Sequence, residues 1–167
     1  LDGIEGLREG LDKGIVCSNY VDPNKTWELL QKFKGGNAVF TQPTTPIKCG
    51  GAPQKAAYMA ADYFRKKGIS NKTNLVFATP GSVIFGVKII ADSLMKVLGD
   101  YNIHFKTFYA PIKIDSENKI VYFKEVSTGE NKCVVKENNN LNQKHTGNEI
   151  MEIPFDFLHL APPQAPP

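Results

Sequence analysis

The chain has 167 residues, of which 41% are hydrophobic and 22% charged, a composition typical of a globular domain with its own core. Its formal net charge is +3 and its lysines are scattered along the sequence, so nothing favours nucleic-acid binding. No apolar run approaches the roughly 18 residues of a membrane-spanning helix, and no His or Cys cluster has the spacing of metal ligands.

The first half of the chain alternates predicted helices and strands. A helix over 23–33 begins with Asp22 as its N-cap and Pro23 at its first helical position, and its apolar stripe includes Trp27. A short strand over 37–43 follows. A proline-rich turn then leads into a second helix, which begins with a proline and ends in a basic last turn followed by glycine.

The second half begins with a buried-looking strand over 73–80, a turn, and a helix over 87–99. Apolar or alternating runs predict one or two strands over 102–115 and further strands at 117–126, 131–137 and 151–161. The polar, asparagine-rich stretch 136–149 predicts a solvated loop. This order of elements predicts an α/β fold: a three-layer, dinucleotide-binding (Rossmann-like) domain with a parallel sheet and an antiparallel β layer beside it.

One cysteine stands where the chemistry of a nucleophile is favoured. In "TTPIKCGGAPQKAA", Cys49 precedes the start of the second helix, whose positive end lowers the pKa of a nearby thiol. Lys48 is adjacent and Lys55 lies in the first helical turn. Gly50 and the glycine after it would let a ligand approach the backbone. The sequence favours a reactive thiol here, and the alternative is a buried core cysteine.

The other two cysteines give weaker signals. Cys17 follows a short apolar run and could be a second reactive thiol or a packed residue at a strand end; Cys133 lies among charged residues in a β-rich region and is interpreted as structural. Three cysteines without a C-x-x-C pair disfavour a zinc site and a self-contained disulfide framework. The histidines are unclustered: His104, His145 and His159.

The stretch "FATPGSVIFGVKII", residues 77–90, lies where a nicotinamide-binding domain would carry its phosphate loop. The G-x-G-x-x-G pattern is absent, since apolar side chains separate Gly81 from Gly86. Such side chains would crowd a pyrophosphate. The interpretation is a dinucleotide-type scaffold that has lost NAD(P) binding, with a generic β–α turn as the alternative.

The pattern P-x-x-P-x-K-C-x-G-A-P around Cys49, together with "KTWELLQKFKGGNAVF" and "FLHLAPPQAPP", resembles the sulfide:quinone oxidoreductases, in particular the mitochondrial type. The resemblance runs from about Gly14 to the end and departs at the asparagine-rich loop. It implies a member of the flavoprotein disulfide reductase superfamily that binds FAD, oxidises hydrogen sulfide through a cysteine persulfide and passes electrons to a quinone. Cys49 matches the first of the two sulfur-carrying cysteines, and the second would lie downstream of Pro167.

The resemblance also implies roles for further residues. Lys48 and Lys55 would assist the sulfur anion, and the residues near the flavin would be Gly50, Cys17 and Pro162. A small thiol or sulfite would accept the sulfur. The expected location is the surface of the mitochondrial inner membrane, or alternatively of a bacterial inner membrane, with membrane contact made by regions outside this chain.

Because the sequence lacks an initiator Met and its ends do not look natural, it is interpreted as an internal segment. Residues 1–35 would be a lead-in and helix from the flavin-domain side, and 36–167 the NAD(P)-binding-like second domain. FAD would be held mainly by other parts of the protein, so the segment alone is expected to be inactive. The alternatives are a type II NADH dehydrogenase-like flavoprotein and a non-catalytic Rossmann-like binding module.

Overall fold

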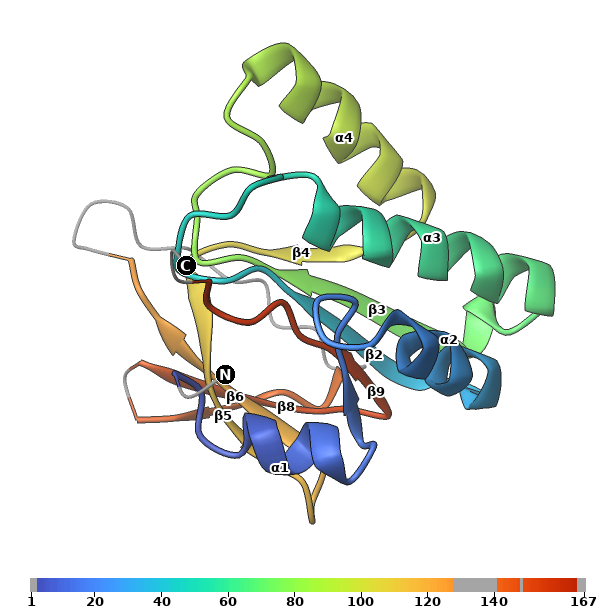
Figure 1. Ribbon diagram of the computed structural model, residues 1–167. Coiled ribbons are helices and arrows are strands. Elements are labelled where there is room, and N and C mark those ends of the chain that lie inside the picture. Colours follow the sequence, from blue (N-terminus) through green and yellow to red (C-terminus); the bar gives the residue numbers. More distant parts are fainter. Residues whose placement is uncertain (1–2, 128–140, 148, 165–167) are drawn as a thin grey trace.

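The computed structural model describes residues 3–127, 141–147 and 149–164. Its elements form three layers (Figure 1): the helices that connect the strands of a parallel sheet cover one face of it, and an antiparallel sheet, together with the first short helix, lies on the other side. The predicted α/β, three-layer fold is confirmed. The helices are α1 (Leu7–Asp12), α2 (Pro23–Lys32), α3 (Ala52–Lys67) and α4 (Lys88–Asp100), with a 3₁₀ turn η1 (Ser70–Lys72).

The central sheet is parallel throughout. In spatial order, its strands are β1 (Val16–Cys17), β9 (Phe157–His159), β2 (Gly36–Thr41), β3 (Thr73–Ala78) and β4 (His104–Lys106). Helices α2, α3 and α4 connect β1 to β2, β2 to β3 and β3 to β4. All three lie on the same face of the sheet (Figure 1), as repeated crossovers of one hand require.

The second sheet is antiparallel. Its strands, in spatial order, are β5 (Tyr109–Asp115), β6 (Ile120–Glu125), β8 (Ile150–Pro154) and β7 (Lys144–Thr146). Strand β7 falls within the stretch predicted as a loop, so that prediction is wrong for 144–146. Its three side chains are exposed, which explains why no apolar pattern marks it. The predicted strand 131–137, with Cys133, lies outside the described residues.

Hydrophobic residues form one core on each face of the parallel sheet. Ala38 and Phe40 of β2 pack toward the helices, whereas Val39 between them packs toward the antiparallel sheet. All three side chains are buried, because a central parallel strand is covered on both faces. This explains why β2 and β3 are continuous apolar runs in the sequence.

Local signals predict the helix ends well. The side chain of Asp22 accepts the backbone N–H groups of Asn24 and Lys25, at 2.9 and 3.2 Å, as an N-cap does. Gly68 ends α3 in the left-handed conformation. Trp27, in the apolar stripe of α2, is 49% exposed and lies edge-on to Tyr63 of α3.

Two of the apolar runs each contribute a strand to both sheets. The run 102–115 becomes β4 and β5, which belong to different sheets and are separated at Phe108, a residue with a φ of +63°. The run 151–161 becomes β8 and β9, and the chain crosses from the antiparallel to the parallel sheet near Asp156. The carboxylate of Asp156 accepts the N–H of Asn37 at 2.9 Å and so joins the crossing point to β2.

The segment predicted as a lead-in packs onto the same sheet as the rest. Strand β1 pairs with β9, and α2 lies beside α3 on the helical face (Figure 1). The boundary at residue 35 stays a prediction.

Candidate functional site

Cys49 lies in the turn between β2 and α3, at the carboxyl edge of the parallel sheet. Since the strands are parallel, the segments that follow β1, β9, β2 and β3 all emerge at this edge, which is where open α/β sheets bind their ligands. The end of the described chain lies beside the turn (Figure 1). There the N–H of Gln164 donates to Thr45 Oγ1 at 2.8 Å, and the N–H of Ala161 donates to Thr41 Oγ1 at 3.3 Å.

The thiol of Cys49 is free and exposed. The alternative of a buried core cysteine is therefore wrong, whereas reactivity itself stays a prediction. The carbonyl of Cys49 accepts the N–H of Ala52 at 3.1 Å, which fixes the turn against the first residue of α3. The N-cap residue of α3 is Gly51, which has no side chain to cap the helix. Cys49 therefore lies two residues before a helix start whose backbone N–H groups have no capping side chain.

The two lysines and the glycine predicted around the sulfur are all exposed: Lys48, Gly50 and Lys55. A Cβ built on Gly50 would have one atom within 4 Å, Phe85 Cε2 at 3.8 Å. The backbone at Gly50 is therefore open to approach from solvent. Pro162 is buried. Next to it, Ala161 bonds to Thr41 at the end of β2, and two residues further on Gln164 bonds to Thr45 of the turn.

The structure adds a tyrosine that the sequence reasoning missed. Tyr20 lies after β1, and its pKa is raised, first by burial and second by the negative charge of Cys49. Tyr20 follows β1 as Cys49 follows β2, so both residues lie at the carboxyl edge of the sheet. No local pattern marks Tyr20, because 28 intervening residues separate it from Cys49 and only the sheet order brings β1 and β2 to one edge.

Cys17 is buried in the packing beneath α2. Its Sγ donates to the carbonyl of Leu158 at 3.4 Å, and burial raises the pKa of the thiol to about 12. The structure thus favours the packed strand-end interpretation over a second reactive thiol. Contact between Cys17 and a flavin remains untested.

His159 pairs in register with Cys17. Its Nε2 accepts the N–H of Asn19 at 3.1 Å, its ring stacks on Phe40, and burial lowers its pKa to about 4. It is a neutral, packed histidine at neutral pH.

The segment between β3 and α4 does not form a phosphate-binding turn. Neither Gly81 nor Gly86 has a positive φ, and Ile84 between them is buried in the core on the helical face. Helix α4 begins only at Lys88. A pyrophosphate would need glycine backbone and a helix start in place of that apolar side chain. This geometry supports the interpretation that NAD(P) binding has been lost.

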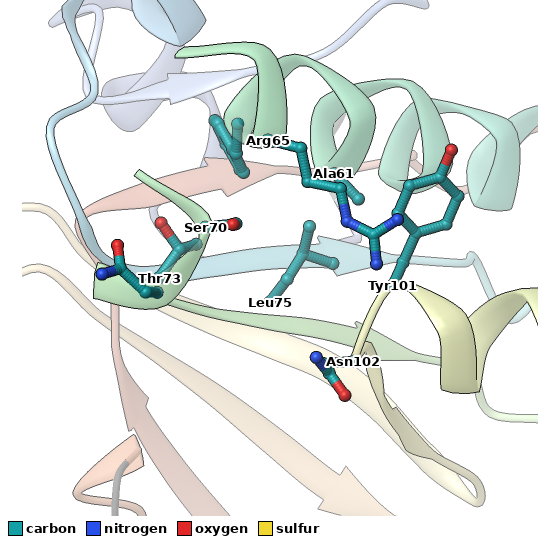
Figure 2. Close-up of a pocket in the computed structure, with 9 residues that line it drawn as sticks. Ala61, Arg65, Ser70, Thr73, Leu75, Tyr101 and Asn102 are labelled. Carbon is teal, nitrogen blue, oxygen red and sulfur yellow. The ribbon is translucent and has the colours of Figure 1, made fainter. Parts of the chain in front are cut away.

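A cavity of about 210 Å³ lies at the opposite, amino edge of the sheet (Figure 2). The guanidinium of Arg65 lies 4.4 Å from the ring centre of Tyr101 and donates to the carbonyl of Asp100. Thr73, the first residue of β3, also lines the cavity, so this cavity and the Cys49 turn are at different ends of the strands.

Within the described part of the chain, no group of three or more His, Cys, Asp or Glu side chains could hold a metal ion. No helix there has the length and apolar content to cross a bilayer.

No protein-family model matches the chain. Its fold is a Rossmann-like α/β fold, similar to that of two solved proteins. The sulfide:quinone oxidoreductase of Aquifex aeolicus superposes with a TM-score of 0.70 at 18% identity, over 100% of this chain and 34% of that one. NDH2 of Plasmodium falciparum, solved with NADH, superposes with a TM-score of 0.50 at 18% identity, over 85% of this chain and 25% of that one.

The sequence is similar to mitochondrial sulfide:quinone oxidoreductases. It is 36% identical to the Mus musculus protein, and the match covers 98% of this chain and 33% of that protein. It is 33% identical to the Dictyostelium discoideum protein, and the match covers 99% of this chain and 32% of that protein. The chain thus spans about one third of the length of these relatives. The predicted resemblance to the sulfide:quinone oxidoreductases is confirmed.

Proposed function

We propose that this chain is the cysteine-bearing, NAD-domain-like part of an FAD-dependent sulfide:quinone oxidoreductase. The relatives that match it along nearly all its length carry that name. The observation that carries the proposal is the exposed sulfur of Cys49 at the start of α3. The thiolate is the reactive form of cysteine, and the sulfur of Cys49 is accessible to solvent near a helix start.

The proposed chemistry uses Cys49 as a sulfur carrier. Hydrosulfide attacks a disulfide between Cys49 and a partner cysteine elsewhere in the protein. The S–S bond breaks, a new S–S bond forms on Cys49, and the partner leaves as a thiolate that carries the electron pair. The persulfide on Cys49 then transfers its outer sulfur to a small thiol or sulfite. Throughout, Lys48, Lys55 and the N–H groups at the start of α3 would hold the anionic sulfur.

The residues at this edge fit contact with a flat ring, although not with a whole dinucleotide. The exposed sulfur and the open backbone at Gly50 leave room for an isoalloxazine face, and Pro162 would support the turn from below. No phosphate-binding turn is present in the β3–α4 connection, so other parts of the protein would hold most of the FAD. When bound, FAD would supply two-electron transfer from sulfide to quinone.

The location follows from the relatives, which are named as mitochondrial proteins. We propose a mitochondrial protein attached peripherally to the inner membrane, where a quinone is available. Membrane contact would be made outside this chain.

The proposal is tested by replacing Cys49 with Ser in the complete flavin-loaded protein. Serine keeps the size of the side chain but forms no persulfide, so sulfide should no longer bleach the flavin absorbance while flavin content stays unchanged. The matched control is Cys133→Ser, which should bleach as the parent does. Near-normal bleaching of the Cys49 variant would end the proposal, and tight binding of NADH in a titration would revive the NADH dehydrogenase alternative.

A further inference from the structure

One buried amide joins the turn before α3 to the connection between β3 and α4. Gln54 is 1% exposed, and its Nε2 donates to the carbonyl of Gly50 at 3.2 Å and to the carbonyl of Ile84 at 3.1 Å. Its Oε1 accepts the hydroxyl of Tyr58 at 2.7 Å. Gly50 belongs to the cysteine turn and Ile84 to the β3–α4 connection, so a single side chain joins two segments that are distant in the sequence.

The chemistry of this position calls for an amide. Gln54 is the third residue of α3, a position from which a side chain usually reaches back to cap the helix start. In this structure the Gln54 side chain instead meets two carbonyl oxygens, those of Gly50 and Ile84, and a carbonyl oxygen needs an N–H donor. A glutamine supplies two such donors and one acceptor, and all three are used. A glutamate of the same shape would place a carboxylate against two carbonyl oxygens and lose both bonds.

The hydroxyl that holds the other end of the amide is a reliable donor. Burial raises the pKa of Tyr58 to about 12, so the phenol stays protonated throughout the neutral range. Its bond to Oε1 fixes which end of the Gln54 amide faces the two carbonyls. The amide is therefore locked in one orientation.

Gly50 follows Cys49 directly, so a restraint on its carbonyl is a restraint on the sulfur-bearing residue. The ring of Phe85, one residue after Ile84, lies beside Gly50 and supports the same contact between the turns. On the basis of the proposed function, we propose that Gln54 is a positioning residue for the sulfur chemistry: its amide clamps the Cys49 turn to the β3–α4 connection and holds the sulfur where it reacts.

The test uses Gln54→Glu and Gln54→Leu in the complete flavin-loaded protein, with exposed Gln31→Leu on α2 as the matched control. Sulfide-driven flavin reduction and turnover should slow at least about tenfold in both Gln54 variants, since displacements of about 1 Å cost rates of that order or more. The KM for quinone and the flavin content should not change. A purely structural role would instead lower flavin content and thermal stability and leave the rate per bound flavin unchanged.

A second readout does not depend on activity. The N–H groups of Ala52 and Lys55 bond to the carbonyls of Cys49 and Gly51, so their hydrogen exchange reports on the turn. Exchange in the peptide 49–58 should be faster in the Gln54 variants and unchanged in the control. Parent-like exchange together with a parent-like rate would overturn the proposal.

Two further outcomes stay decisive. If the Gln54 variants fail to retain flavin, Tyr58→Phe is tested in their place, because it removes only the hydroxyl that orients the Gln54 amide. A several-fold slower reduction of the flavin by sulfide supports the clamp, and an unchanged rate of reduction refutes it. If the parent flavin is not reduced by sulfide at all, the proposed function fails, whereas the exchange comparison still decides whether Gln54 clamps the turn.

Discussion

His159 makes the stability of the fold depend on pH, and the size of the effect follows from its burial. The ring is 1% exposed and stacks on Phe40, and burial lowers its pKa from 6.5 to about 4. The unfolded chain therefore binds a proton at a higher pH than the folded chain does. Full stability is present above pH 6.5 and is lost as the pH falls toward the folded value.

Linkage gives the magnitude. Between about pH 7.5 and about pH 5, a pKa that moves from 6.5 to about 4 removes about 2 kcal/mol from the free energy of unfolding. With a urea dependence of about 2 kcal/mol per molar, the unfolding midpoint should fall by about 1 M from this residue alone. Other groups also titrate in this range, so the comparison must be made against a variant.

The assay is urea unfolding at both pH values for the parent and for His159→Gln. Glutamine places an acceptor where Nε2 receives the N–H of Asn19, but it does not titrate. The variant should lose about 2 kcal/mol less stability between the two pH values than the parent does. Equal losses in the two proteins would show that His159 is not the group responsible, and would refute the reasoning.

Two further predictions concern the crossing point between the sheets. In a thermal unfolding assay, Gly36→Ala should destabilise the protein by about 3 kcal/mol, because the φ of Gly36 is +105° and an added Cβ would lie 2.0 Å from Asp156 Oδ2. The control Gly99→Ala lies in open space on α4 and should stabilise the protein by up to about 1 kcal/mol. Asn37→Ala should cost about 2 kcal/mol, because the buried amide donates to the carbonyls of Leu141 and Pro154, while exposed Asn71→Ala should change stability by less than about 0.5 kcal/mol. Equal effects within either pair would contradict these assignments.

The features that the sequence predicts are those encoded locally. The Asp22 cap and the glycine after α3 need only neighbouring residues, and both are confirmed. The place of Cys49 at the carboxyl edge follows from one more step, since a turn between a parallel strand and the next helix must lie there. Its exposure follows from the proline- and glycine-rich turn, which has few side chains able to cover it.

The features that the sequence does not predict depend on distant partners. The run 151–161 is apolar throughout, and a buried strand has the same pattern whichever sheet it joins, so its division into β8 and β9 cannot be read from it. Strand β1 has two residues, too few for any periodicity. Gln54 resembles an ordinary polar residue of a helix, and only the fold brings it to the carbonyl of Ile84.

The most direct test of the account is to find where the sulfur atom goes. The complete flavin-loaded protein is mixed with sulfide without oxygen or acceptor, alkylated and digested, and the peptide that contains Cys49 is analysed by tandem mass spectrometry. We expect one additional sulfur atom on Cys49, removable by a small thiol. Bleached flavin with an unmodified Cys49, and the extra sulfur on another residue, would contradict it.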